Sequence, residues 1–394
     1  MKTLTAEQAL ANSFNHHSFA RTSSSIAGMA ANLVGLHNTS PVSPYFSLLA
    51  RIPDFARSDL EVEMWDSRRL ARFRAMRSTI FVFPIDLLEI AAAATRHIIQ
   101  PLAERWLRDS GLTDQEYARL TAAVDEALTD GPLTVRALRQ TLDVPQSVDL
   151  PGVVSRMCEV GKVAGGAPPR SWRSAVRQYH RWQDTLPCVD LQRWDEESAI
   201  RELIDRYIRS YGPVTIDDIS WWTGITKGRC RSALDTLDVE EVEVDGWPGP
   251  LYRARSGGNK AEMGSPVRAL PLLDPYVQGY RDRHRFIDPA LHDFIYDGGG
   301  NSTATIVHRG RIIGVWQISE DPAPSVRYHL FANGPAGLRS AAEIELATAG
   351  ALYFDRPVDI VNIATMKPLS ADGGRSASHP LDSRLHRASR RQRT

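Results

Sequence analysis

Two stretches of the chain share one pattern of apolar and polar positions. In residues 114–128 and again in residues 196–211, apolar side chains recur three and four positions apart, which predicts an amphipathic helix in each. Each helix is expected to stop at a Gly-Pro pair. Thr134 and Thr215 follow those pairs, where a threonine hydroxyl can cap a second, short helix. The pattern therefore predicts the same helical unit twice.

The repeat extends beyond these helices. Residues 131–144 align without gaps on residues 212–225, which identifies an internal repeat. A third helix is predicted after each copy, near 148–159 and 226–237, and a β-rich stretch follows each one. In the second of these stretches, residues 239–254 alternate apolar and polar side chains and contain a turn, as a β-hairpin does. Three helices and a hairpin are typical of a winged-helix unit, whose third helix can lie in the major groove of DNA.

The flanking regions are less regular. The elements predicted there are helices over 5–13, 24–36, 60–73 and 85–97, and strands over 75–83, 267–273, 302–307 and 311–318. Pro84 is expected to end the first of these strands, and Arg309-Gly310 to form the turn between the last two. The late strands predict a small β domain, which follows a flexible link or wing tip at residues 255–260.

Composition narrows the class of protein. Hydrophobic residues make up 42% of the chain and charged residues 24%, and no apolar run approaches the roughly 20 residues of a membrane helix. Because the N-terminus also lacks the apolar core of a signal peptide, we expect a soluble, cytoplasmic protein. The three cysteines follow no metal-binding spacing, so neither disulfides nor zinc are expected. The formal net charge is zero, so binding to nucleic acid would depend on a local basic groove and weaken as salt rises.

Seven segments, spread in order over about 280 residues, carry a family resemblance. They are residues 33–36, 65–70, 76–80, 211–215, 221–224, 272–283 and 310–316. Together they resemble the bacterial winged-helix DNA glycosylases of the AlkZ type. The resemblance implies tandem winged helices and a β-barrel around duplex DNA, with hydrolysis of the N-glycosidic bond of N7-alkylated purines. Members of the family unhook interstrand crosslinks or protect the makers of DNA-alkylating antibiotics.

The predicted fold class is α+β, with tandem winged-helix (helix-turn-helix) units followed by a small β-barrel-like domain. At about 150 residues per domain, the chain is long enough for two or three domains with cores of their own. The predicted divisions are an N-terminal winged-helix-like unit with the catalytic loop at 1–110, winged helices at 111–190 and 191–262, the β-barrel-like domain at 263–368 and a disordered basic tail at 369–394.

The family's active motif is glutamine, an aliphatic residue and glutamine, following Gly-Leu. Here those positions hold His37, Asn38 and Thr39, and all three depart from the pattern. The resemblance makes this triplet the predicted catalytic site. Without it, the same residues would be interpreted as the polar end of a helix, with Asn38 as a cap and His37 interacting with the helix dipole.

The substrate chemistry allows such a departure. N7-alkylation makes guanine cationic, so the base leaves without protonation and the sugar passes through an oxocarbenium-like state. The site must supply an oriented water and acceptors that face the developing positive charge. Neutral His37 could hold or deprotonate the water, and the Thr39 hydroxyl could bind the same water. Asn38 could keep an amide in the site only if the loop is shifted from the family geometry.

Candidate DNA contacts are polar residues in three places. These are the strand predicted over 75–83, the helix predicted near 226–237 (the recognition helix, which would enter the major groove) and the segment after the first strand of the β domain. The candidate residues are Arg77, Ser78, Thr79, Lys227, Arg229, Arg231, Arg281 and Arg283. A surface salt bridge is the alternative for Arg77. Because residues two apart lie on different faces of a helix, we expect only two of the three basic residues on the recognition helix to reach DNA.

Three other residues are interpreted as structural, and one histidine pair is not interpreted as a metal site. Trp221 and Trp222 are expected to pack in the core, and Asp274 to act as a hydrogen-bonding group. His16-His17 has no partner cluster, so no metal site is predicted.

The predicted function is a monofunctional DNA glycosylase without metal or cofactor, acting as a monomer in the nucleoid. Its partner would be double-stranded DNA that carries alkylated purines, and its target bulky or crosslinked N7-alkylguanine, in repair or in self-resistance to a DNA-alkylating natural product. The loop would approach the lesion inside the duplex, because a bulky intercalated adduct opposes base flipping. The alternatives are a winged-helix transcription regulator and a lesion-binding protein without catalysis.

Overall fold

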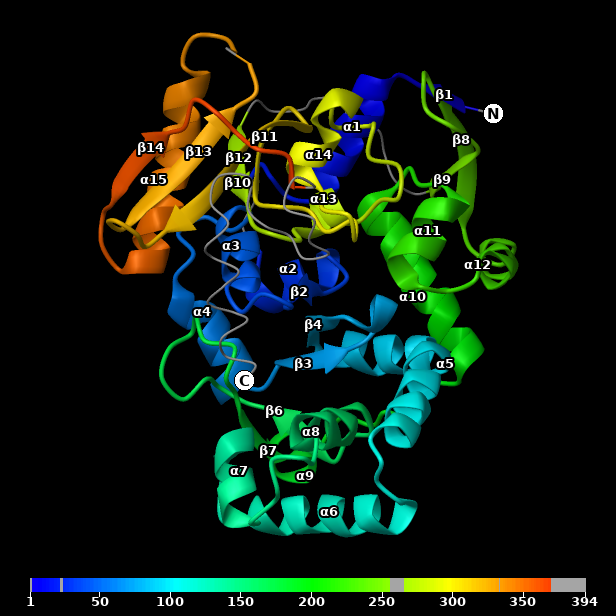
Figure 1. The fold of residues 1–394 in the computed structure, drawn as a ribbon. Coiled ribbons are helices and arrows are strands. Elements are labelled where there is room, and N and C mark those ends of the chain that lie inside the picture. The colour runs from blue at the N-terminus through cyan, green and yellow to red at the C-terminus, as the bar shows by residue number, and fades with distance from the viewer. Residues whose placement is uncertain (1, 22–23, 256–265, 333, 370–394) are drawn as a thin grey trace.

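The computed structural model describes residues 2–21, 24–255, 266–332 and 334–369 of the 394-residue chain, and shows an α+β fold (Figure 1). Residues 256–260 of the predicted link and 370–394 of the predicted tail lie outside the described residues. No helix in the described ranges is both long and apolar enough to cross a membrane.

The N-terminal region combines helices with a small sheet. Its elements are β1 (Lys2–Leu4), α1 (Ala6–His16), α2 (Ile26–Asn32), β2 (Leu36–His37), α3 (Ser43–Leu49), α4 (Arg57–Glu61), β3 (Leu70–Arg74), β4 (Ile80–Pro84) and α5 (Ile85–Asp109). A π-helical turn over Val62–Asp66 follows α4, and a 3-10 turn over Met76–Ser78 precedes β4. The sheet order is β2-β4-β3. This sheet carries His37 on its short edge strand.

Several predictions for this region are wrong at their edges. The helix expected over 24–36 ends at Asn32, before β2, and the helix expected over 85–97 continues to Asp109. The helix expected over 60–73 ends at the π-helical turn, and its last residues form β3, where Phe73 pairs with Phe81 of β4. Buried Phe73 alternates with partly exposed Arg72 and Arg74, a period of two that fits a strand. The strand expected over 75–83 starts only at Ile80, because the 3-10 turn occupies the residues before it.

The two copies of the repeat share an order of three helices followed by two strands, and the first copy also contains the short β5 and α9. The first contains α6 (Asp114–Ala127), β5 (Leu133–Thr134), α7 (Val135–Thr141), α8 (Leu150–Glu159), β6 (Val163–Gly165), β7 (Gln178–Arg181) and α9 (Trp182–Thr185). The second contains α10 (Glu196–Tyr211), α11 (Ile216–Thr223), α12 (Lys227–Leu234), β8 (Val239–Val244) and β9 (Leu251–Ala254).

Threonine caps begin the second helix of each copy, as the sequence predicts. The Thr134 hydroxyl accepts from the Ala137 N–H at 3.1 Å, and that of Thr215 from the Asp218 N–H at 3.0 Å. Each copy ends in an antiparallel strand pair, β6 with β7 and β8 with β9. In the second copy β1 adds a parallel partner to β8, a pairing between distant segments that the sequence pattern did not indicate.

The C-terminal region is an open sheet with a helix packed against it (Figure 1). Its elements are β10 (Val267–Leu270), α13 (Pro275–Gln278), α14 (His292–Ile295), β11 (Thr305–His308), β12 (Arg311–Ser319), β13 (Ser325–Leu330), α15 (Leu338–Phe354) and β14 (Asp359–Asn362). A 3-10 turn over Pro289–Leu291 precedes α14.

The described strands do not close into a barrel-like domain, so this part of the predicted fold class is wrong. The strand order is β10-β11-β12-β13-β14, with β10 and β14 at opposite edges. After α15 the chain returns beside β13 as a parallel strand, which extends the sheet in place of joining its two edges.

Hydrophobic packing divides the molecule unequally. One large core cluster joins β4, α10, α11 and the segment around α13, with Phe83, Tyr207 and Tyr276 among its members. The helices α6, α7 and α8 have a separate core that includes Leu138 and Leu150. Figure 1 shows this first copy at one end of the molecule, where α5 leads into it. The ring of His37 contacts Phe81, a member of the large cluster, so His37 lies beside that core.

Candidate functional site

His37 lies at the end of β2, on a backbone that a glycine allows to approach β4. Gly35 has φ +99°, and a Cβ there would lie 2.5 Å from Cε1 of Phe83, so a side chain is excluded on two grounds. Leu36 and His37 then pair with Val82 and Phe81. The interpretation of the triplet as a helix end is wrong, because α2 already stops at Asn32.

The environment of His37 keeps its imidazole neutral. The side chain is buried, and its ring packs edge-on against Phe81 at a centroid distance of 5.0 Å. Burial, together with the nearby charge of Arg77, lowers the pKa of His37 to about 3. Nδ1 accepts from the Thr39 backbone N–H at 3.4 Å, which assigns the proton of the neutral ring to Nε2. His37 is thus suited to donate a hydrogen bond from Nε2 and is a poor base.

The other two residues of the triplet have different surroundings. The Asn38 backbone N–H donates to the Ile80 carbonyl at 2.8 Å, and its side-chain Oδ1 accepts from Nε of Arg72. Burial lowers the pKa of that arginine. Thr39 is exposed. Neither Asn38 nor Thr39 lines the cavity beside His37, so the structure brings only one of the three residues to it.

The cavity beside His37 has a volume of about 30 Å³, the share of one water molecule in the liquid. Its lining comes from five parts of the chain: His37, Met76, Arg77, Thr79, Phe81, Trp222, Leu273, Pro275, Gln278 and Asn301. Polar groups and aromatic rings both face it, so a single water could be held there in a defined orientation.

Two amide residues at this cavity were missed by the sequence analysis. Gln278 Nε2 donates to the Gly300 carbonyl at 2.9 Å, and its Oε1 accepts from the Ser302 N–H at 3.1 Å. Asn301 Nδ2 donates to Asp297 at 3.0 Å. Gln278 lies within one of the segments that carried the family resemblance, which was a usable signal. For Asn301 the only signal was the run of glycines before it.

Arg77 and Arg283, which are far apart in sequence, meet at one aromatic ring. The guanidinium carbon of Arg77 lies 3.8 Å from the centre of the Trp221 ring, and that of Arg283 lies 5.4 Å from it. Within the described residues Arg77 forms no salt bridge, so the alternative interpretation as a surface ion pair is not supported. The partly buried ring of Trp221 is a platform for both cations, whereas Trp222 is core packing as predicted.

Ser78 and Thr79 have local hydrogen bonds. The Ser78 hydroxyl accepts from Arg74 at 3.3 Å, and the Thr79 hydroxyl donates to the Met76 carbonyl at 2.9 Å. Both bonds hold the 3-10 turn that presents Arg77, whose own φ is +52°. The structure therefore gives these two residues a role in shaping the turn.

The basic residues of α12 differ in their partners. Lys227 pairs with Asp217 at 2.6 Å, and Arg229 pairs with Glu196 and Glu197, also at 2.6 Å. Arg231 is exposed. Arg281 is exposed as well, while its backbone N–H donates to Asp218 at 2.8 Å. DNA contact by Lys227 or Arg229 would therefore compete with an acidic partner, whereas Arg231 and Arg281 present their side chains to solvent.

Asp274 has the structural role that the sequence predicts. It forms a fully buried, two-pronged ion pair with Arg51, with nitrogen–oxygen distances of 2.7 and 2.9 Å. His17 is buried beside this pair, and burial followed by the charge of Arg51 lowers its pKa well below the usual value. Among the described residues no group of three histidine, cysteine, aspartate or glutamate side chains is placed to hold a metal ion.

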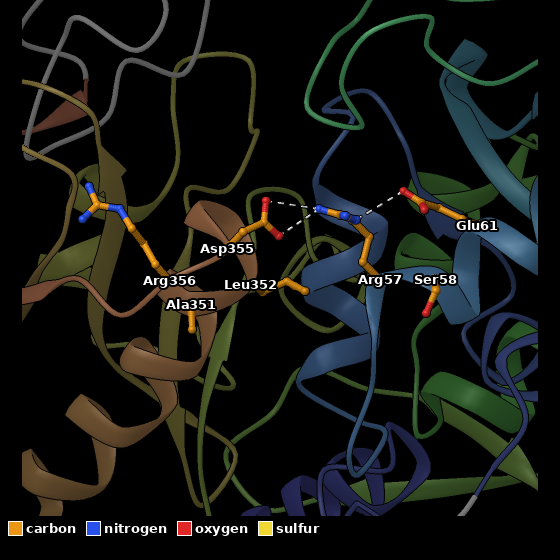
Figure 2. Close-up of a pocket in the computed structure, with 7 residues that line it drawn as sticks. All are labelled: Arg57, Ser58, Glu61, Ala351, Leu352, Asp355 and Arg356. Carbon is orange, nitrogen blue, oxygen red and sulfur yellow. Dashed lines mark hydrogen bonds and ion pairs between the residues drawn. The ribbon is translucent and has the colours of Figure 1, made fainter.

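A larger but shallow depression lies elsewhere, between α4 and the end of α15 (Figure 2). Arg57 stands between two carboxylates there, 3.0 Å from Asp355 and 3.5 Å from Glu61. None of the predicted site residues lines it. Its central charges are paired with each other, so it is not a candidate for the catalytic site.

This chain is similar to known proteins both in sequence and in structure. The curated interstrand DNA cross-link repair glycosylase of Streptomyces sahachiroi is 23% identical over 233 residues, which cover 55% of this chain and 62% of that protein. The aligned part is thus less than two thirds of the relative's length. The solved structure of Streptomyces sahachiroi DNA glycosylase AlkZ has a TM-score of 0.73 at 19% identity, and the match covers 92% of this chain and 100% of that one.

The structural match shows that the two proteins share a fold, and the family match shows to which family this chain belongs. The AlkZ-like DNA glycosylase family matches residues 30–352, which include the His37 cavity, Arg77 and Arg283. This chain belongs to the AlkZ-like family of DNA glycosylases.

Proposed function

We propose that this protein hydrolyses the N-glycosidic bond of bulky or crosslinked N7-alkylguanine in duplex DNA, in repair or in self-resistance to a DNA-alkylating compound. The observation that carries the proposal is a neutral, buried His37 beside a water-sized cavity. His37 lies within the residues that match a DNA glycosylase family, at the position where the sequence resemblance puts the active motif. The relative from Streptomyces sahachiroi is named for repair of interstrand cross-links, which supports a large lesion as the target.

The chemistry requires a positioned water more than a strong base. The glycosidic bond breaks with its electron pair going to the cationic purine, which leaves as a neutral base. The oxygen of a neutral water then bonds to the anomeric carbon of the oxocarbenium-like sugar and releases a proton to solvent. A histidine with a pKa of about 3 accepts no proton near neutral pH, which removes deprotonation of the water from the two roles considered for it. His37 would donate from Nε2 to the water oxygen and fix its position.

Asn38 and Thr39 take supporting roles in this proposal. Asn38 binds Arg72 through its amide oxygen, and Thr39 holds the ring of His37 through its backbone N–H. Both contacts orient the loop on which His37 lies. We therefore assign the direct contact with water to His37 and positioning to its two neighbours.

The scaffold in this proposal consists of two winged-helix units. We infer it from the common order of capped helices and a terminal antiparallel strand pair in both copies. DNA would contact the exposed arginines Arg231 and Arg281, while the lesion lies near the edge strand β2. The predicted divisions at residues 110, 190, 262 and 368, and the monomeric state, belong to the same proposal.

The test uses a duplex with a single bulky N7-guanine adduct. After incubation with protein, heating under alkali converts each abasic site into a strand break. We expect breaks with the wild-type protein and about 100-fold slower excision by His37→Ala, the usual scale for losing one positioned donor. His37→Gln should keep part of the activity, because an amide can also donate to the water. His329→Ala, on β13 and outside the cavity, is the matched histidine control.

The outcomes separate the competing functions. Tight binding of the damaged duplex without strand breaks would support a lesion-binding protein. Preferential binding of one undamaged sequence, with the adduct left intact, would support a transcription regulator. Excision that is unchanged in His37→Ala would contradict the role of this histidine.

A further inference from the structure

Arg77 and Arg283 lie beside the His37 cavity without an acidic partner. Arg77 lines the cavity, and both guanidinium groups stand over the ring of Trp221. Neither forms a salt bridge with any residue that the structure describes. By contrast, Arg285, two residues after Arg283, pairs with the buried Asp218 at 2.7 Å. Two like charges are thus held at one aromatic ring.

This arrangement is unfavourable in the free protein. Burial lowers the pKa of both guanidinium groups, and the charge of Arg283 lowers that of Arg77 further. Asp297 is the acid that acts on Arg283, but its carboxylate accepts from the backbone N–H groups of Gly299 and Asn301 at 2.9 and 2.8 Å. Desolvated cations side by side favour the binding of an anion that would compensate both.

Unused hydrogen-bond donors point the same way. Nε1 of Trp221 and Nε of Arg283 are buried and have no hydrogen-bond partner among the described residues. Buried donors in proteins are almost always paired. The Arg283 side chain is only 8% exposed, and its Nη2 donates to the Gly300 carbonyl at 2.7 Å. The donors left over would suit a ligand that presents several acceptor oxygens.

Packing holds the guanidinium groups in place before any ligand arrives. The guanidinium carbon of Arg283 also lies 3.8 Å from the centre of the Tyr296 ring. Gly300 has φ +76°, and a Cβ there would lie 3.3 Å from Nη2 of Arg283, so the loop closes against this side chain. A fixed, planar guanidinium group matches the geometry of phosphate better than a flexible ammonium group does.

We propose that Arg77, Trp221 and Arg283 form a binding site for one phosphodiester of the DNA backbone, and that this phosphate sets the position of the damaged nucleotide at His37. The proposal rests on the proposed function for the presence of DNA. The three residues come from the turn before β4, from α11 and from the segment after α13, so the site exists only when these parts are packed together.

The experiment removes one backbone charge at a time. Duplexes with the bulky N7-guanine adduct carry a single neutral methylphosphonate at successive linkages near the lesion, and binding is measured at several salt concentrations. At one of these linkages, the neutral methylphosphonate should weaken binding to the wild-type protein by about tenfold. This is the scale of one hydrogen bond to a charged group. Arg77→Ala should weaken binding of the natural duplex by a similar factor and show no further loss at that linkage. The affinity of Arg77→Ala should also depend less steeply on salt concentration, by about the amount expected for the loss of one phosphate contact.

Two further variants keep the test decisive. Arg77→Lys keeps the charge but loses the planar stack, so its affinity should lie between those of the wild type and Arg77→Ala. Arg57→Ala, in the depression of Figure 2, removes one positive charge outside the site and should retain the tenfold loss at the sensitive linkage. Thermal melting shows whether each variant is folded, and Arg77→Lys carries the comparison if Arg77→Ala is not.

The proposal is overturned if no linkage is sensitive in the wild type, or if Arg77→Ala and Arg77→Lys keep the full loss at the linkage that is. Because the readout is binding, it is separate from excision. A protein with a sensitive linkage but no strand breaks would contradict the proposed function alone. Excision without a sensitive linkage would contradict the phosphate site alone.

Discussion

The two copies of the repeat begin from the same pattern and serve different parts of the molecule. Leu138 in α7 and Ile219 in α11 occupy aligned positions, and both are fully buried. The next aligned positions differ, since exposed Gln140 and Thr141 of the first copy correspond to Trp221 and Trp222 of the second. The first copy closes a core of its own, and the second joins the large core beside His37. A repeat therefore sets the local fold, and a few side chains decide what it packs against.

The strongest test of this comparison is a matched pair of alanine substitutions. Trp222 is buried and stacks on Tyr207 at a centroid distance of 4.9 Å. Trp222→Ala should lower the free energy of unfolding by about 3–5 kcal/mol through the cavity it leaves. Thr141→Ala, at the aligned exposed position, should change it by no more than about 0.5 kcal/mol. Chemical denaturation measures both, and equal effects would break the comparison.

A second pair tests whether the two cores are independent. Leu138→Ala and Ile219→Ala should each cost roughly 2–5 kcal/mol, because both remove a fully buried side chain. Hydrogen exchange should show faster opening of α6 to α8 for the first variant and of α10 and α11 for the second. Excision should fall only for Ile219→Ala. Loss of protection in α10 for Leu138→Ala would show that the cores are coupled.

A smaller loss of stability is expected in acid. It comes from His37, which lies beside the large core that the second copy joins. Because the folded protein holds the pKa of His37 at about 3, below that of an ordinary histidine, the unfolded chain binds a proton that the folded chain does not. The stabilisation is full above about pH 6.5 and is lost as the pH falls from there toward 3. Between pH 7.5 and 5.5 this histidine alone should cost roughly 1 kcal/mol. His37→Gln should show a smaller decline in denaturation experiments over that range.

The smallest expected effect is a flat pH profile for excision. A histidine that acts as a general base with an ordinary pKa would give an acidic limb near pH 6.5. The neutral donor proposed here stays neutral well below that pH, so single-turnover rates should stay level between pH 5.5 and 8 as long as the protein is folded. A limb near pH 6.5 that disappears in His37→Gln would return deprotonation of the water to the mechanism.

Local signals in the chain were sufficient for much of the scaffold. The helix caps at Thr134 and Thr215 and the hairpin of β8 and β9 were predicted because each depends on residues only a few positions apart. The boundary between α4 and β3 was missed. The mixed apolar and charged residues of β3 are too few to distinguish the period of a helix from that of a strand. The open sheet was missed because strand order depends on where α15 and β14 pack.

The candidate site depended more on the tertiary structure. From the sequence alone came His37 as a residue of interest and Arg77 and Arg283 as separate cations. Only packing decided that these two cations share the ring of Trp221, and that Asn38 binds Arg72 while His37 faces the cavity. Caps and periodic faces are short-range properties of the chain. The pKa of a buried histidine and the meeting of distant charges depend on desolvation and proximity, which arise only when the chain is folded.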